Sequence, residues 1–174
     1  LLPTGKEASA AHLTWDDKII EKGAGTFFEI AGCYRRYHVP LCRTIFLGKP
    51  PTDMLAAEES VLEGIDEAIK ASKPGNTAGG VARAFYAVLE KHGIKRNGRC
   101  GYPIGLSYPP DWGERTFSIR VSDNTILKPN MTFHFMPALW MDDWGLEITE
   151  TLRIRDEGEA ECLANYPRNL LVKG

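Results

Sequence analysis

The chain has 174 residues, a formal net charge of −2 and a charged fraction of 25%. This length is sufficient for one domain with a hydrophobic core. The sequence has no basic stripe, so nucleic acid is not expected as a partner. Its longest apolar runs are too short to span a membrane, so a membrane partner is not expected either.

The cysteines are scattered, form no C-x-x-C motif and follow no signal-peptide pattern. This usage is typical of reduced thiols and predicts a cytoplasmic protein. The chain begins at Leu1 without an initiator Met. We therefore expect residues 1–174 to be the later part of a longer polypeptide.

Residues 1–25 are rich in small residues and are expected to be irregular. Three β-type runs follow, at residues 26–32, 33–39 and 42–47, and they predict an antiparallel meander. Gly and Pro at residues 48–51 end this meander.

Two helices are expected next, because apolar residues recur at helical spacing on one face of each segment. The first runs from about Met54 to Ser72. The second begins after an N-cap at Asn76 or Thr77 and ends near His92.

Residues 100–115, CGYPIGLSYPPDWGER, are too rich in Gly and Pro for a helix or a central strand. The rings of Tyr102, Tyr108 and Trp112 favour a shaped pocket wall with polar tips. A Pro-rich surface connector is the alternative.

Further strands are expected at residues 116–121, 131–139 and 146–154. The order of strands, two helices and strands again predicts an α+β fold. In such a fold an antiparallel sheet carries its helices on one side.

The residues by themselves do not favour a metal site, since the four histidines are far apart and H-E-x-x-H is absent. Glu147 and Glu150 would face opposite sides of one strand. No cysteine has the surroundings of an activated thiol.

Three side chains remain as candidates for function. His12 lies among small residues, which suits a general acid or base, and an inconsequential surface histidine is the alternative. Glu29 follows two phenylalanines in an apolar strand, where a carboxylate must be paired, protonated, functional or turned outward. His134 alternates with Phe133 and Phe135 and so faces solvent or a cleft.

The succession AHLTWDD, GTFFEIAGCYRRYHVPLCRT, GYPIGLSYPPDWGER, LKPNMTFHFMPALW and GLEITETLRI resembles the creatinase/aminopeptidase P, or peptidase M24-like, superfamily. Within it, the long YPIGLSYPPDWGE run resembles the ectoine hydrolase members. The resemblance implies the pita-bread fold, with residues 1–174 as the C-terminal part of one catalytic domain. The opening helices and the N-terminal domain would precede them.

Metal-dependent members of this superfamily hold two cations with two Asp, one His and two Glu. By resemblance these positions fall on Glu29, Pro40, Tyr102, Met136 and Thr149. Proline and methionine are not ligands for such cations, and one carboxylate cannot hold two of them. The resemblance therefore implies no metal and no cofactor.

The resemblance also implies a reaction, the opening of the cyclic amidine ring of ectoine to N-acetyl-2,4-diaminobutyrate. His12 would match the general acid/base histidine of the metal-free creatinase. Glu29 would hold the amidinium, with Glu147 or Glu150 as second candidate. Arg43 or Arg115 would pair with the substrate carboxylate.

Aromatic faces would suit the delocalised cation, and the candidates are Tyr34, Tyr102, Tyr108 and Trp112. The expected partner is this small-molecule substrate, and the full-length enzyme is expected to be a homodimer. Two alternatives remain open. One is a metal-dependent Xaa-Pro-type aminopeptidase or dipeptidase relative, and the other is a non-catalytic pita-bread binding module.

Overall fold

A long hairpin forms one side of the computed structural model, which describes residues 1–14 and 16–174. Its strands, β1 (Gly25–Tyr34) and β2 (Tyr37–Leu47), pair antiparallel from Gly25 with Phe46 to Tyr34 with Tyr37. A two-residue turn at Arg35 and Arg36, both with positive φ, joins them. The prediction of three strands here is wrong, because residues 33–39 contain this turn.

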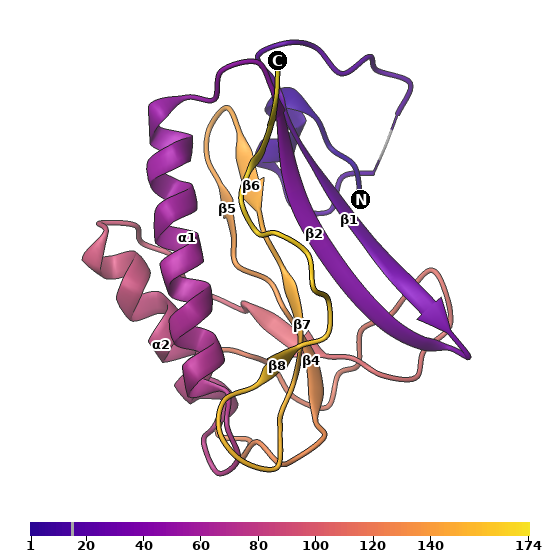
Figure 1. Cartoon of the computed structure of the whole chain (residues 1–174), viewed down its shortest axis with the longest axis vertical. Helices are drawn as coiled ribbons and strands as arrows, with labels where there is room; N and C mark the ends of the chain where they lie inside the picture. Colours follow the sequence, from indigo (N-terminus) through magenta and orange to yellow (C-terminus); the bar gives the residue numbers. More distant parts are fainter. Residues whose placement is uncertain (15) are drawn as a thin grey trace.

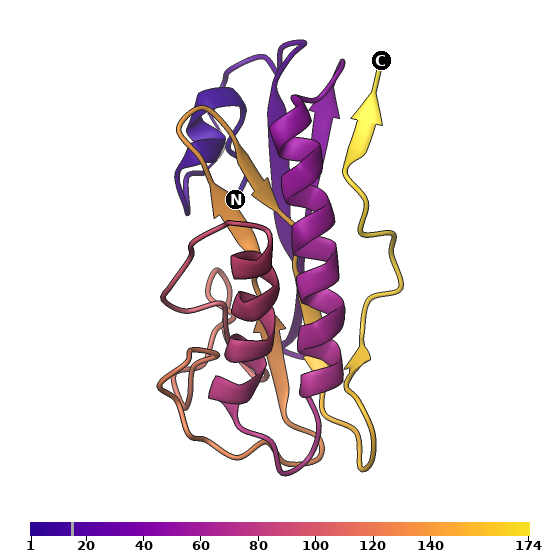
Figure 2. The ribbon, with the colours of Figure 1, turned by 90° about the vertical axis from the view of Figure 1, so that its left-hand side faces the viewer.

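Two helices, α1 (Thr52–Ala71) and α2 (Ala78–Lys91), lie side by side over one face of the strands (Figure 2). They confirm the predicted pair. The Thr77 hydroxyl caps α2 by accepting a hydrogen bond from the Gly80 amide at 3.0 Å. The apolar faces of both helices pack into the main core with Phe133 and Phe135.

The remaining elements are short. The 3₁₀ helix η1 (Gly5–Ser9) precedes the hairpin, and β9 (Leu171–Lys173) runs parallel to β2. A second sheet has the order β3-β4-β7-β8, and β5 and β6 form a separate pair. These strands are β3 (Gly101–Pro103), β4 (Thr132–Phe135), β5 (Ala138–Trp140), β6 (Gly145–Glu147), β7 (Glu150–Arg153) and β8 (Glu161–Cys162).

Three predicted strands differ from the structure. Residues 116–121 form bends instead, where the Asp123 carboxylate accepts hydrogen bonds from the Ser118 and Thr125 amides. Residues 131–139 break at Met136-Pro137 into β4 and β5, since proline cannot donate to a ladder. Residues 146–154 break at Ile148-Thr149 into β6 and β7.

These breaks bring the later strands against the inner face of the hairpin. The Thr149 amide donates to the Cys42 carbonyl at 3.1 Å, and Cys42 pairs with Glu29 across β1 and β2. Tyr102 on β3 pairs with His134 on β4. Four segments that are distant in sequence therefore meet around Glu29. No helix in residues 1–14 and 16–174 is long and apolar enough to cross a membrane.

Candidate active site

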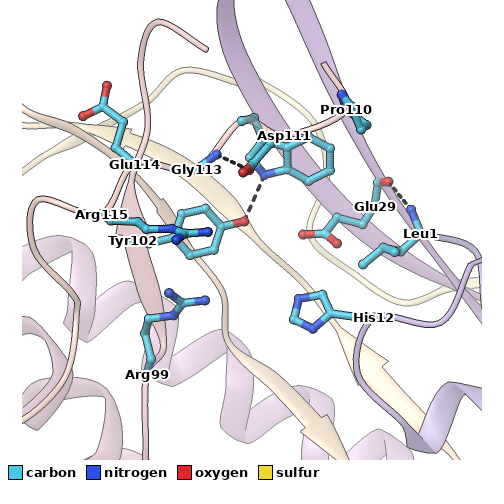
Figure 3. Close-up of a pocket in the computed structure, with 11 residues that line it drawn as sticks. Leu1, His12, Glu29, Arg99, Tyr102, Pro110, Asp111, Gly113, Glu114 and Arg115 are labelled. Carbon is cyan, nitrogen blue, oxygen red and sulfur yellow. Dashed lines mark hydrogen bonds between the residues drawn. The ribbon is translucent and has the colours of Figure 1, made fainter. Parts of the chain in front are cut away.

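A pocket of about 310 Å³ opens beside the inner face of β1 (Figure 3). Its lining residues come from the N-terminal segment, β1, β3 and the Pro-rich segment. They are Leu1, His12, Glu29, Arg99, Tyr102, Pro110, Asp111, Trp112, Gly113, Glu114 and Arg115. The structure thus brings together five of the side chains selected from the sequence.

The two predicted catalytic residues point into the same pocket (Figure 3). Glu29 is 4% exposed, and its burial raises the pKa of the carboxyl. An anionic Glu29 is therefore costly unless a cation approaches it. His12 lies at a turn with φ 65°, and its side chain is exposed. An accessible imidazole and a desolvated carboxyl that face the same pocket are suited to proton transfer.

Tyr102 and Trp112 form the aromatic wall. The Trp112 indole donates a hydrogen bond to Tyr102 Oη at 2.9 Å, which fixes the two rings against each other. The guanidinium of Arg99 lies over the Tyr102 ring, 4.8 Å from its centroid. Burial raises the pKa of Tyr102, so the phenol keeps its proton.

Two of the predicted aromatic residues lie elsewhere. Tyr108 is exposed and accepts a hydrogen bond from Arg36 at 2.6 Å. Tyr34 is exposed at the tip of the hairpin, where Arg35 lies over its ring. Neither of them lines this pocket.

Arg43 and Glu150 form a buried ion pair, with Nη2 and Oε1 2.6 Å apart. The other Arg43 donors bind the carbonyls of Cys42, Thr149, Tyr166 and Pro167. All five N–H donors of the guanidinium are therefore engaged within the protein. Neither Arg43 nor Glu150 lines the pocket.

Glu147, the other second candidate, is buried and does not line the pocket. Burial raises the pKa of its carboxyl to about 8, and the nearby charge of Glu29 adds to the effect. Glu147 therefore keeps its proton at pH 7. Because Glu147 does not line the pocket, it cannot contact a molecule bound there.

His134 and Arg99 contribute to the site in ways that the sequence did not indicate. His134 is fully buried, because neighbouring parts of the protein cover both faces of β4. Its Nδ1 lies 3.0 Å from Tyr102 Oη and 3.8 Å from Glu29 Oε1. Burial lowers its pKa to about 3, so the ring is neutral. Arg99 precedes the Pro-rich segment and lies in no motif that marks a ligand.

Mainly antiparallel sheets with two helices over one face, and a pocket lined in part by β1, define a pita-bread domain. The sequence pattern of metallopeptidase family M24 matches residues 1–156. The chain belongs to this family, and both the predicted superfamily and the predicted fold are confirmed.

Three similar proteins illustrate the relationship. Ectoine hydrolase from Halomonas elongata is 59% identical over 99% of this chain, which spans 43% of that enzyme. The Xaa-Pro dipeptidase from Pyrococcus furiosus is 27% identical, with 98% of this chain and 48% of that one covered. The crystal structure of dipeptidase PepE from Mycobacterium ulcerans superposes with a TM-score of 0.90 at 24% identity, over 99% of this chain and 46% of that one.

The family name implies a metal, and the residues present do not fit one. The positions that the resemblance assigns to ligands hold Glu29, Pro40, Tyr102, Met136 and Thr149, whose side chains include a single carboxylate and no imidazole. Within the described residues, no group of three His, Cys, Asp or Glu side chains is close enough to hold a metal ion. This donor set does not suit two hard cations.

Proposed function

We propose that the full-length protein is a metal-independent hydrolase that opens the cyclic amidine ring of ectoine, or of a very similar compound. Water adds across the amidine C=N bond and a ring C–N bond breaks, which leaves N-acetyl-2,4-diaminobutyrate. The observation that carries the proposal is a pocket in which a buried carboxyl, an accessible imidazole and two arginines converge. The 59% identity to an ectoine hydrolase supports this substrate.

Glu29 binds the cationic end of the substrate in this proposal. An amidinium is planar and offers N–H donors, which a carboxylate accepts in charge-assisted hydrogen bonds. The arriving cation offsets the cost that burial imposes on an ionised Glu29. The face of Trp112 provides a cation–π contribution of about 0.5–2 kcal/mol.

The carboxylate end of the substrate binds to arginine. Arg115 and Arg99 both line the pocket, and both are drawn on its far side from His12 in Figure 3. A guanidinium matches the two oxygens of a carboxylate with parallel N–H donors. A substrate with a cation at one end and an anion at the other is thus held in one orientation.

His12 completes the reaction as general acid. Water attacks the amidine carbon and passes a proton to His12, which forms a tetrahedral intermediate. If an enzyme carboxylate attacks instead, water hydrolyses the resulting acyl-enzyme bond in a second step. His12 then protonates the ring nitrogen as its bond to this carbon breaks. The exposed position of His12 allows it to exchange its proton with solvent afterwards.

A metal-dependent dipeptidase is the second candidate. It is favoured by the 27% identity to the Pyrococcus furiosus enzyme, which extends over 98% of this chain. The donor set described above speaks against it. Ectoine consumption by the full-length protein after exhaustive chelation separates the two functions. An undiminished rate supports the proposal, and Mn²⁺-dependent cleavage of an Xaa-Pro dipeptide without ectoine turnover refutes it.

Binding gives a test that needs no turnover. We expect the melting temperature of the full-length protein to rise with ectoine concentration, because a ligand of the folded state stabilises it by RT ln(1 + [L]/Kd). At a free concentration 100 times Kd this amounts to about 2.7 kcal/mol. An Xaa-Pro dipeptide at equal concentration is the control. A shift with the dipeptide and none with ectoine contradicts the proposal.

Substitution of Glu29 tests the amidinium clamp. We expect Glu29→Gln to raise KM for ectoine about 10- to 150-fold, since a hydrogen bond to a charged group contributes about 1.5–3 kcal/mol. Glu157→Gln is the matched control, because Glu157 is exposed and lies outside the pocket. A loss confined to kcat would instead make Glu29 the attacking group.

A further inference from the structure

A chain of buried hydrogen bonds runs from the pocket wall to the hairpin. Trp112 Nε1 lies 2.9 Å from Tyr102 Oη, which lies 3.0 Å from His134 Nδ1. On the other side of the ring, His134 Nε2 lies 2.7 Å from Thr149 Oγ1. The Cys42 amide donates to the same Thr149 oxygen at 2.7 Å.

The positions of the protons in this series of hydrogen bonds can be assigned by starting from the Thr149 hydroxyl. Thr149 and His134 are both fully buried, so a proton without an acceptor is costly there. Thr149 Oγ1 already accepts from the Cys42 amide. Within the described part of the chain, His134 Nε2 is the only acceptor within hydrogen-bond distance of the Thr149 hydroxyl. Thr149 therefore donates to Nε2.

This donation fixes the tautomer of His134. A neutral imidazole carries one proton, and Nε2 is occupied as an acceptor, so the proton is on Nδ1. Nδ1–H then donates to Tyr102 Oη. The phenol oxygen thus accepts two hydrogen bonds, one from His134 and one from the Trp112 indole. Its own proton is left to point into the pocket, where Tyr102 faces Glu29 (Figure 3).

We propose that the Tyr102 hydroxyl is a catalytic hydrogen-bond donor and that His134, held by Thr149, is its positioning residue. The inference rests on the proposed function. The hydroxyl donates to the oxygen that is added at the amidine carbon and becomes the carbonyl oxygen of the product. Two N–H donors to the phenol oxygen polarise its O–H bond and fix its direction before the substrate arrives.

The proposal also accounts for the residues that stand in the ligand positions of the family. Tyr102 and Thr149 occupy two of these positions by resemblance, and here they are the two hydroxyls of one hydrogen-bond chain. At the place where the family's ligands would bind a metal, this protein thus presents a neutral hydroxyl, that of Tyr102, to the substrate. Because burial raises the pKa of Tyr102, this donor stays protonated at neutral pH.

The tautomer of His134 is measured on the full-length protein without any substrate. Long-range ¹H–¹⁵N correlation spectra distinguish Nδ1–H from Nε2–H, and the His134 signals are those absent from His134→Asn. We expect the Nδ1–H form, with no titration down to about pH 4. An Nε2–H form overturns the proposal, because Tyr102 would then donate to His134 and not to the pocket.

Kinetics test the catalytic part. We expect Tyr102→Phe, which keeps the ring, to lower kcat for ectoine about 10²- to 10³-fold with little change in KM, the loss typical of one oxyanion donor. We expect Thr149→Val to lower kcat as well, because it removes the hydroxyl that holds His134. The matched Thr149→Ser keeps the hydroxyl and should have a kcat close to that of the wild-type protein. An unchanged kcat in Tyr102→Phe refutes the proposal. Failure of the wild-type protein to open ectoine refutes the proposed function instead, and leaves the tautomer to be measured.

Discussion

His12→Ala is expected to lower kcat for ectoine opening about 10²- to 10⁴-fold, the contribution typical of a positioned general acid. The ring nitrogen leaves poorly unless it is protonated as the C–N bond breaks, and His12 is the only histidine that lines the pocket within the described residues. KM should change little, because the amidinium and the carboxylate of the substrate bind elsewhere. The measurement is the rate of ectoine consumption by the full-length protein.

His92→Ala is the matched control for this variant. His92 is an exposed histidine at the end of α2, where it contacts Glu63 outside the pocket. We expect the control to keep the wild-type rate. Because His12 is exposed in a turn, its removal should leave the melting temperature unchanged. A His12→Ala protein that opens ectoine at an undiminished rate removes His12 from the mechanism.

The elements with strong local signals were predictable from the sequence. Both helices appear where apolar periodicity and the Thr77 cap indicate them. The ends of the strands were harder to predict. Arg35 and Arg36 adopt positive φ values in the turn of the hairpin, and this turn carries no Gly or Asn to indicate it. The break between β4 and β5 does carry a sequence signal, since Pro137 cannot donate to a ladder.

The site was predictable where a residue conflicts with its surroundings. Glu29 stands out as a carboxylate in an apolar strand, and Tyr102 and Trp112 as rings in an irregular segment. Alternation could not place His134, because both faces of β4 are covered. Nor could the sequence show that the donors of Arg43 are occupied, since their acceptors lie more than 100 residues away except for Cys42.

Arg43 provides the prediction with the largest effect on stability. We expect Arg43→Met to lower the free energy of unfolding by about 3–5 kcal/mol, the cost typical of breaking a buried ion pair. The substitution leaves the carboxylate of Glu150, which is 1% exposed, with Arg168 as its one remaining cation among the described residues. It also leaves the carbonyls of Thr149 and Pro167 without their donor. Urea unfolding of the full-length protein measures the change.

Lys70→Met is the matched control, because Lys70 pairs with Glu67 at the surface of α1. Exposed pairs contribute about 0–1 kcal/mol, so the control should be close to wild type. The same comparison decides between two roles for Arg43. A structural role lowers stability and leaves KM for ectoine unchanged at temperatures where the variant is folded. An Arg43→Met protein of normal stability with a greatly raised KM would return Arg43 to the substrate carboxylate, because only a ligand contact would then have been lost.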